Sequence, residues 1–316
     1  MDHFGDGIVL IDKEEGRSSF DVVKEVRRIL KIKKVGHAGT LDPFATGLLV
    51  VLLGQGTKLA PYLMAGVKEY RATLRLGVET DTMDPTGLIV QTRPVPAFEM
   101  EHIRETALGF TGDIEQVPPS FSAVKYKGQR AYALARKGIR VALKKRKAMV
   151  HQLEIISVDL PDITMVVTCS RGTYMRSLAA DLGKALGTGA HLRSLRRLSS
   201  GSFSVKEALC LRELETDFPD KILRQKVISL RDALPGMGEA QVDGRTARKI
   251  RNGYQPRWNE LQVQSEPTEL DEWDMKVVKG SDLVALMKVG RDSHGGEVRS
   301  RVTRVFSEDS QGVFGL

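Results

Sequence analysis

Short runs of apolar and β-branched residues recur along the first two thirds of the chain. The runs at 7–11 and 48–53 have the length and composition of buried strands. Residues 70–76 alternate between apolar and polar side chains, and 150–158 and 163–169 also have strand character. These five segments predict a sheet with at least one face covered by other elements.

Four further segments carry the periodicity of amphipathic helices. The first begins at Ser19, which we expect to cap it, and places the apolar residues between 22 and 30 on one face. The others are 99–108, 130–137 and 173–186. Strands and helices follow one another without a regular βαβ repeat, which predicts an α+β fold with a mixed, mainly antiparallel sheet.

The pattern changes beyond Pro235 and Gly236, where short strand-like pieces replace the longer elements. We therefore expect two domains, a large one over 1–237 and a small β-rich one over 238–316.

The distribution of charge along the sequence agrees with this division into two domains. The sequence has 48 Lys and Arg against 40 Asp and Glu, a net charge of +8, yet the twelve basic and twelve acidic residues after 240 cancel. Three single-sign clusters lie upstream, of which the one between 116 and 153 contains no acidic residue. The clusters comprise Lys24, Arg27, Arg28, Lys31, Lys33 and Lys34; Lys125, Lys127, Arg130, Arg136, Lys137, Arg140, Lys144, Lys145, Arg146 and Lys147; and Arg193, Arg196 and Arg197. A solvated surface or an anionic membrane could also explain them, but a nucleic acid is favoured because no Trp- or Phe-rich amphipathic helix accompanies them.

Several classes of protein are excluded. No apolar run approaches the roughly 18 residues of a membrane-spanning helix, and the N-terminus lacks a secretory pattern, so we expect a cytoplasmic protein without a membrane partner. The two cysteines, Cys169 and Cys210, do not form a disulfide framework or a zinc motif, and the six histidines never fall at metal-ligand spacing. Cys169 is expected to be buried and structural.

The loop over 36–47 is the first candidate for chemistry. Its glycines allow the backbone to approach a ligand closely, and it carries one carboxylate, Asp42, immediately before Pro43. A similar string at 84–87, Asp-Pro-Thr-Gly, is interpreted as an ordinary hairpin turn. Asp42 is therefore either another turn aspartate or a functional carboxylate.

A second candidate is the string Arg-Gly-Thr-Tyr-Met-Arg over 171–176, where a predicted strand meets a predicted helix. Tyr174 and Arg176 are either surface residues of a first helical turn or a base-stacking ring and an arginine directed at a carboxylate or phosphate.

At these residues the chain resembles the TruB-type tRNA pseudouridine synthases. Gly-His-Ala-Gly-Thr-Leu-Asp-Pro-Phe-Ala-Thr-Gly-Leu-Leu (36–49), Lys-Glu-Tyr-Arg-Ala (68–72) and Cys-Ser-Arg-Gly-Thr-Tyr-Met-Arg-Ser-Leu (169–178) resemble three motifs of that family. Three further stretches match in the same order, at 117–125, 131–138 and 189–197. The resemblance covers roughly residues 7–205.

The resemblance implies the pseudouridine synthase fold and a reaction that isomerises uridine 55 in the T loop of tRNA, without a cofactor or a metal. It implies that Asp42 is the catalytic carboxylate, either as nucleophile or as base toward the sugar. Arg176 would pair with Asp42 and hold its pKa down. Tyr70 would stack on the uracil and could also remove the C5 proton, although at its usual pKa it is a poor base.

Three more residues match the family's substrate-binding positions. They are His37, which would contact the region of the target nucleotide, and Tyr174 and Leu195, which would form the wall of the uracil pocket. The target base would leave its stack to enter that pocket. The T arm of tRNA is the implied partner, bound by a monomer without a guide RNA, and residues from about 238 resemble a small PUA domain.

One motif departs from the family. The usual Lys-Pro-x-Gly-x-Thr-Ser string is Lys-Glu-Glu-Gly-Arg-Ser-Ser at 13–19, and because Lys13, Gly16 and Ser19 remain we expect its turn to survive. Other functions stay open: a guide-dependent enzyme of the same fold, as in dyskerin-type proteins, a non-catalytic RNA-binding module, or an enzyme acting on a small molecule.

Overall fold

A large sheet of ten strands forms the body of the protein, as seen in a computed structural model that describes residues 5–122, 124–139, 141–215, 225–263, 272–291 and 298–308. The strands are β1 (Gly7–Lys13), β2 (Val35–His37), β3 (Thr46–Leu53), β4 (Lys68–Leu76), β7 (Gly112–Gln116), β10 (Arg146–Asp159), β11 (Asp162–Cys169), β12 (Ala190–Ser200), β13 (Phe203–Ser204) and β14 (Leu209–Cys210). Their order is β14–β1–β3–β12–β4–β11–β10–β7, with β13 paired to β12 and β2 to β3.

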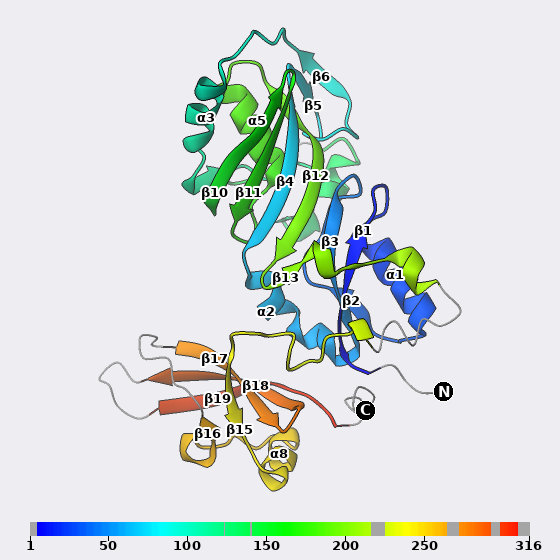
Figure 1. Cartoon of the computed structure of the whole chain (residues 1–316), viewed down its shortest axis with the longest axis vertical. Helices are drawn as coiled ribbons and strands as arrows, with labels where there is room; N and C mark the ends of the chain where they lie inside the picture. The colour runs from blue at the N-terminus through cyan, green and yellow to red at the C-terminus, as the bar shows by residue number, and fades with distance from the viewer. Residues whose placement is uncertain are drawn as a thin grey trace.

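The sheet is mixed and mainly antiparallel, which confirms the prediction. Only the β1–β14 and β12–β3 pairs are parallel among the strand pairs described in it. The β12–β3 pair joins the two halves of the sheet at Arg196 and Arg197, opposite Thr46 and Gly47. The candidate loop before β3 therefore lies at the centre of the sheet (Figure 1).

Helices flank this sheet. They are α1 (Ser19–Leu30), α2 (Ala60–Ala65), α3 (Met100–Leu108), α4 (Ala131–Ala135), α5 (Met175–Ala185) and α6 (Leu211–Leu214), with 3-10 turns at Gly54–Leu59 and Val205–Glu207. Two small hairpins extend from the body, one of β5 (Val78–Thr80) and β6 (Ile89–Thr92) and the other of β8 (Lys125–Tyr126) and β9 (Gln129–Arg130).

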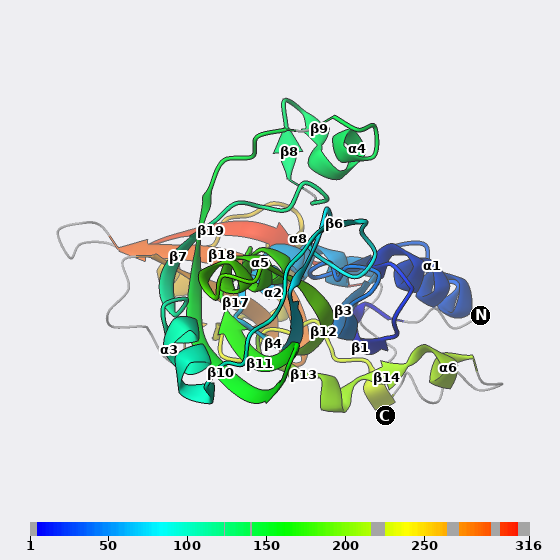
Figure 2. The same cartoon turned by 90° about the horizontal axis from the view of Figure 1, so that it is seen from above.

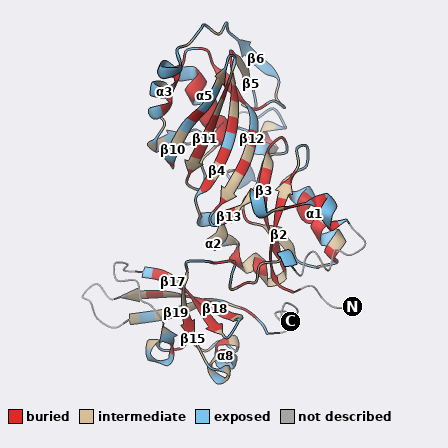
Figure 3. Ribbon diagram, viewed as in Figure 1, coloured by how far each residue is buried: buried red, intermediate tan, exposed pale blue. Residues whose placement is uncertain are grey.

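Burial follows the periodicity of the sequence. Alternate residues of β4 are buried, and α5 packs its Leu178 and Leu182 into the same core cluster as Leu74 and Ile163. Figure 3 shows this burial as the red residues along the central strands. The helix α1 forms as predicted, but Ser18 rather than Ser19 is its cap: Ser18 Oγ accepts a hydrogen bond from Asp21 N at 3.1 Å.

A second sheet of five strands begins at Gly238. Its strands are β15 (Gly238–Gln241), β16 (Gln262–Val263), β17 (Glu272–Lys279), β18 (Asp282–Arg291) and β19 (Val298–Val305), in the order β16–β15–β17–β18–β19, and α8 (Gly244–Arg251) and a 3-10 turn at Trp258–Glu260 lie beside them. This sheet packs below the large one, against the region of α2 (Figure 1). Phe306 is fully buried and shares a core cluster with Ile8 and Leu48 of the large sheet.

Candidate active site

The loop that carries Asp42 is fixed from beneath by buried polar contacts. Lys13 is fully buried, and its Nζ donates to the carbonyls of Arg17 at 2.8 Å and Pro43 at 3.2 Å. The amide of Gly16 also donates to the Pro43 carbonyl, at 2.8 Å. The turn over 13–16 is therefore intact without a proline at position 14, as predicted. Hydrogen bonds from Lys13 Nζ and the Gly16 amide to the Pro43 carbonyl hold it in place.

Ser19 fastens the same loop from another side. Its hydroxyl accepts a hydrogen bond from the Leu41 amide at 2.8 Å and donates to the Leu41 carbonyl at 3.1 Å. The first turn of α1 thus lies directly beside the residue that precedes Asp42. Ser19 is not the helix cap that its position suggested, but an anchor for the loop that carries Asp42.

Arg176 unites two carboxylates from different loops. Its Nε lies 3.0 Å from Asp42 Oδ2, and its Nη1 lies 3.1 Å from Asp84 Oδ2. The guanidinium also donates to the carbonyls of Thr82 at 3.1 Å and Phe121 at 2.9 Å. Only 7% of the Arg176 side chain is exposed, compared with 36% of Asp42, so Asp42 is the end of this buried network that reaches solvent. The predicted pairing of Asp42 with Arg176 is present.

Residues 84–87 form the turn between β5 and β6, as predicted, but Asp84 is more than an ordinary turn residue. Its Oδ1 does cap the turn, accepting hydrogen bonds from Thr86 N at 3.0 Å and Thr82 Oγ1 at 2.7 Å. Its Oδ2, however, faces Arg176, and the side chain is only 6% exposed. Asp84 is therefore both a turn residue and a counter-ion of the active-site arginine.

The net pKa of Asp42 differs in direction from the prediction. Burial disfavours the carboxylate and raises the pKa of Asp42 above its ordinary value of 3.8. Arg176 and Lys13 act in the opposite direction, whereas the negative charge of Asp84 adds to the effect of burial. Arg176 does stabilise the ionised form, as predicted, but it does not outweigh desolvation.

Tyr70 and Leu195 lie on neighbouring strands beneath the loop. Both are buried and belong to one core cluster with Leu41 and Phe44, which flank Asp42 in sequence. Burial raises the pKa of Tyr70 above its ordinary value of 10.0. Its phenol is therefore less able to act as a base than a free tyrosine, which favours the stacking role.

Tyr174 and His37 border the same region. Tyr174 precedes α5, and its backbone is held by Gln116, whose side-chain oxygen accepts from the Tyr174 amide at 3.0 Å and whose side-chain nitrogen donates to its carbonyl at 3.3 Å. His37 ends β2, and its buried Nδ1 has no hydrogen-bond partner among the described residues. Burial and the charge of Arg197 lower the pKa of His37, so its ring is neutral at physiological pH.

The third basic cluster does not form a free cationic surface. Arg197 is 1% exposed and donates to the carbonyls of Leu48 at 2.7 Å and Gly39 at 3.1 Å. Arg196 pairs with Asp12 at 2.6 Å, and Arg193 pairs with Asp162. Arg197 is therefore engaged inside the fold, whereas the side chains of Arg193 and Arg196 stay 49% and 40% exposed beside their carboxylate partners.

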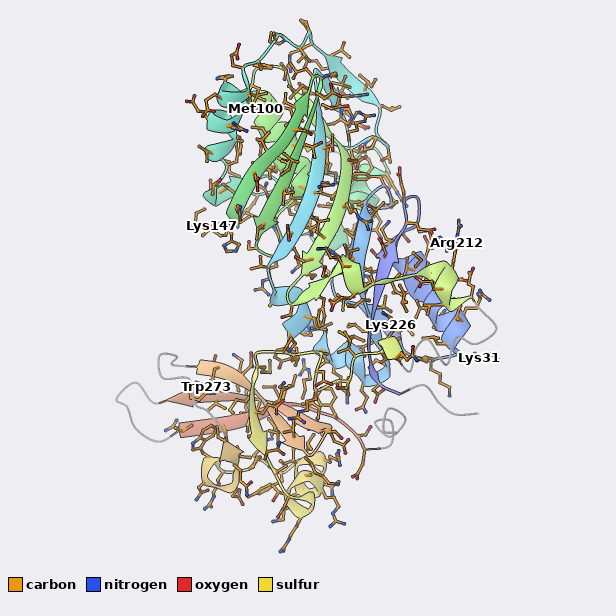
Figure 4. All side chains as sticks on the ribbon, in the orientation of Figure 1. Lys31, Met100, Lys147, Arg212, Lys226 and Trp273 are labelled. Atoms are coloured by element: carbon orange, nitrogen blue, oxygen red, sulfur yellow. The ribbon has the colours of Figure 1, made fainter. Side chains whose placement is uncertain are left out.

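The other two clusters are exposed. Lys24, Arg27, Arg28 and Lys31 follow the solvent face of α1, and Lys144–Lys147 lie at the start of β10. Figure 4 places Lys31 and Lys147 on opposite sides of the large sheet. Seen from above, β8, β9 and α4 of the second cluster project from the body (Figure 2). Arg140 of that cluster lies outside the described residues.

The sequence reasoning missed three residues of the site, Asp84, Arg197 and the full role of Lys13. Lys13 and Arg197 lie in stretches that resemble the family, whereas the Asp-Pro-Thr-Gly string at 84–87 indicates only a turn. Cys169 is fully buried with its pKa raised to about 11, which agrees with a structural role. Within the described residues, no cluster of His, Cys, Asp or Glu could hold a metal ion, and no helix is long and apolar enough to cross a membrane.

The fold is that of the pseudouridine synthases. The chain is similar over 98% of its length to Cbf5 in a crystal structure of a Cbf5–Nop10–Gar1 complex, with a TM-score of 0.76, 25% identity and 88% of that chain covered. Cbf5 in an archaeal box H/ACA sRNP Nop10–Cbf5 complex has the same fold, with a TM-score of 0.72, 24% identity, and 96% of this chain and 87% of that chain covered.

Sequence comparison specifies the family. Residues 27–175 match the N-terminal domain of the TruB family of pseudouridylate synthases, and residues 176–237 match the C-terminal domain of tRNA pseudouridylate synthase B. The tRNA pseudouridine synthase B of Geotalea uraniireducens is 40% identical over 306 residues, covering 96% of this chain and 99% of that protein. The protein of the same name from Desulfotalea psychrophila is 48% identical over 233 residues, covering 72% and 95%. The chain belongs to the TruB family of tRNA pseudouridylate synthases and is an isomerase.

Proposed function

We propose that this protein converts uridine 55 in the T loop of tRNA to pseudouridine, with Asp42 as the catalytic carboxylate. The observation that carries the proposal is the arrangement of Asp42, which is partly exposed at the end of a loop while Arg176 pairs with it from a buried position. A carboxylate held in this way can reach a nucleotide from solvent and remain fixed during the reaction. The names of the relatives support tRNA as the substrate.

The reaction balances without any added electron carrier. The bond between C1′ and N1 breaks, the uracil rotates, C5 bonds to C1′, and the C5 proton is released while N1 gains a proton. Asp42 must be ionised to attack the sugar as a nucleophile or to remove a proton from it. Arg176 and Lys13 favour that ionised form, and the carbonyls around Arg176 keep the guanidinium in place.

The base would leave the RNA stack and lie over Tyr70, with Leu195 and Tyr174 as the wall of its pocket and His37 toward the neighbouring nucleotide. Extrusion of a base costs a few kcal/mol. Phosphate contacts by the exposed clusters on α1 and before β10 would offset that cost.

We further propose a division at residue 237. Residues 1–237 would form the catalytic domain and 238–316 a PUA-like domain that contacts RNA outside the T loop. The protein would act as a cytoplasmic monomer, without a guide RNA.

The proposal is tested by tritium release from tRNA transcripts labelled with 5-³H-uridine. Wild type should release one equivalent per tRNA, and Asp42→Asn none, while the dissociation constant of Asp42→Asn for tRNA stays within a few fold of wild type. A transcript with cytidine in place of uridine 55 is the matched substrate control and should yield no release. Release from that transcript would contradict the assigned position, and full activity of Asp42→Asn would contradict the assigned carboxylate.

Guide-dependent modification is a second candidate, because the similar solved structures are Cbf5 in complexes with Nop10 and Gar1. A free hairpin with the sequence of the T arm separates the two. We expect turnover of this hairpin by the protein alone. Absence of turnover, restored by a complementary guide RNA, would favour the second candidate.

A further inference from the structure

We propose that Phe20 and Lys24 form a stacking platform for a base of the RNA substrate that lies next to the flipped-out uridine. This inference rests on the proposed function and adds a contact to it. Phe20 is 60% exposed and is the only exposed phenylalanine among the described residues. A single exposed apolar side chain is ordinary, so the argument depends on what surrounds it.

The first observation is the position of Phe20 relative to the catalytic loop. Its neighbour Ser19 is hydrogen-bonded to both the amide and the carbonyl of Leu41, one residue before Asp42. While Ser19 faces inward, Phe20 is on the solvent side of the same helical turn. The Phe20 ring therefore lies beside the residue that anchors the loop of Asp42, where nucleotides next to a bound uridine would be within its reach.

The second observation is the charge around the ring. The Nζ of Lys24 lies 4.7 Å from the centroid of the Phe20 ring, one helical turn further along α1. Exposed cations continue along the same solvent face at Arg27, Arg28 and Lys31. A cationic track that ends at an exposed aromatic ring is the arrangement with which proteins hold single-stranded nucleic acid: cations follow the phosphates and the ring stacks on a base.

These observations favour RNA over other occupants. An anionic membrane would require several apolar side chains on this face, whereas the exposed residues that follow Phe20 there are all charged, and most of them are cations. The ion pair between Lys24 and Asp21, at 3.8 Å, is long and exposed. Lys24 can thus exchange this partner for a phosphate at little cost.

The test measures binding and chemistry separately, with the T-arm hairpin as probe. Phe20→Ala should raise its dissociation constant about tenfold, within the range for loss of one base–aromatic stack. Phe20→Trp should restore binding, and Phe20→Leu should not, because stacking needs a flat ring rather than apolar volume. The single-turnover rate at saturating enzyme should stay at the wild-type value. Leu108→Ala in α3, where the side chain is 65% exposed, is the matched control and should bind as wild type.

Two further measurements identify the contact. Lys24→Ala should reduce the slope of log affinity against log salt by about one, whereas Phe20→Ala should leave it unchanged. Abasic substitutions along the T loop should include one that weakens binding to wild type but not to Phe20→Ala. Wild-type affinity of Phe20→Ala or Phe20→Leu for the hairpin would overturn the proposal. So would additive effects of Phe20→Ala and the abasic substitution on the binding free energy at every site tested. Failure of wild type to turn over the hairpin would instead count against the proposed function.

Discussion

Asp42 and Asp84 come from different loops, yet their carboxylates share the guanidinium of Arg176, at 3.0 Å and 3.1 Å. Each aspartate precedes a proline, and the two strings were distinguished only by their surroundings in the sequence. One carboxylate is almost fully buried and the other is partly exposed. The two carboxylates therefore differ in setting: Asp84 neutralises the arginine inside the protein, and Asp42 reaches solvent.

Removal of the arginine should leave Asp84 without a counter-ion. We expect Arg176→Met to lower the free energy of unfolding by about 3 kcal/mol, because an uncompensated buried charge remains. The double variant Arg176→Met, Asp84→Asn should recover part of this loss. Urea unfolding of wild type and of all variants measures both quantities. If the double variant were less stable than Arg176→Met by the full cost of Asp84→Asn alone, the two side chains would not be coupled.

The acidic limb of the pH–rate profile should report the ionisation of Asp42. Because burial raises the pKa of Asp42, single-turnover activity should fall as the pH decreases through this raised pKa, above the ordinary value of 3.8. Asp84→Asn removes a negative charge that raises the pKa of Asp42. The acidic limb of this variant's pH–rate profile should therefore move to lower pH, even though its plateau rate is reduced. Saturating enzyme excludes changes in RNA affinity. A limb that moved to higher pH in Asp84→Asn would contradict this electrostatic account.

The basic residues just before β10 and the ion-paired arginines of β12 should respond differently to mutation. Lys144→Glu with Lys145→Glu should weaken binding of tRNA and lower its salt dependence, since both side chains are exposed. Arg193→Gln with Arg196→Gln is the matched pair, and it should change affinity little because Asp162 and Asp12 already engage these arginines. Titrations at several salt concentrations compare the two. Equal losses in both double variants would show that the internal pairs open on binding.

The two cysteines should differ in reactivity. Cys169 is fully buried with its pKa raised to about 11, whereas Cys210 is exposed. A disulfide reagent should therefore modify one thiol per native chain and two after denaturation, without loss of tritium release. Modification of Cys169 in the native protein, or loss of activity after modification of Cys210, would be inconsistent with this structure.

Much of the fold could be predicted because the spacing of apolar residues in the sequence reflects which side chains are buried. The alternation over 70–76 and the apolar stripe of α1 both correspond to observed elements. Asp42 could be singled out from its glycine-rich loop and its resemblance to the family. Asp84 could not, because its second role depends on Arg176, which is 92 residues away in the sequence. The same limit applies to Arg197: a run of arginines looks identical whether it faces solvent or carbonyls inside the sheet.

The direction of the Asp42 pKa illustrates another limit. A motif can indicate which residues form a pair, but not how much water the pair loses on folding. Desolvation outweighs the contribution of Arg176 here. Only the packing of the surrounding loops determines this balance.

The burial of Phe306 has a consequence for how such proteins can change over time. The match to the two family domains ends at residue 237, yet Phe306 shares a core cluster with Ile8, and Lys58 Nζ donates to the Val305 carbonyl at 2.6 Å. The boundary at residue 237 therefore does not separate two independent hydrophobic cores. A C-terminal sheet exchanged for that of a distant relative would have to supply an apolar side chain at the position of Phe306 to keep this core filled. Substitutions at Phe306 and at the residues of the large sheet in the same core cluster should therefore be coupled in their effect on stability.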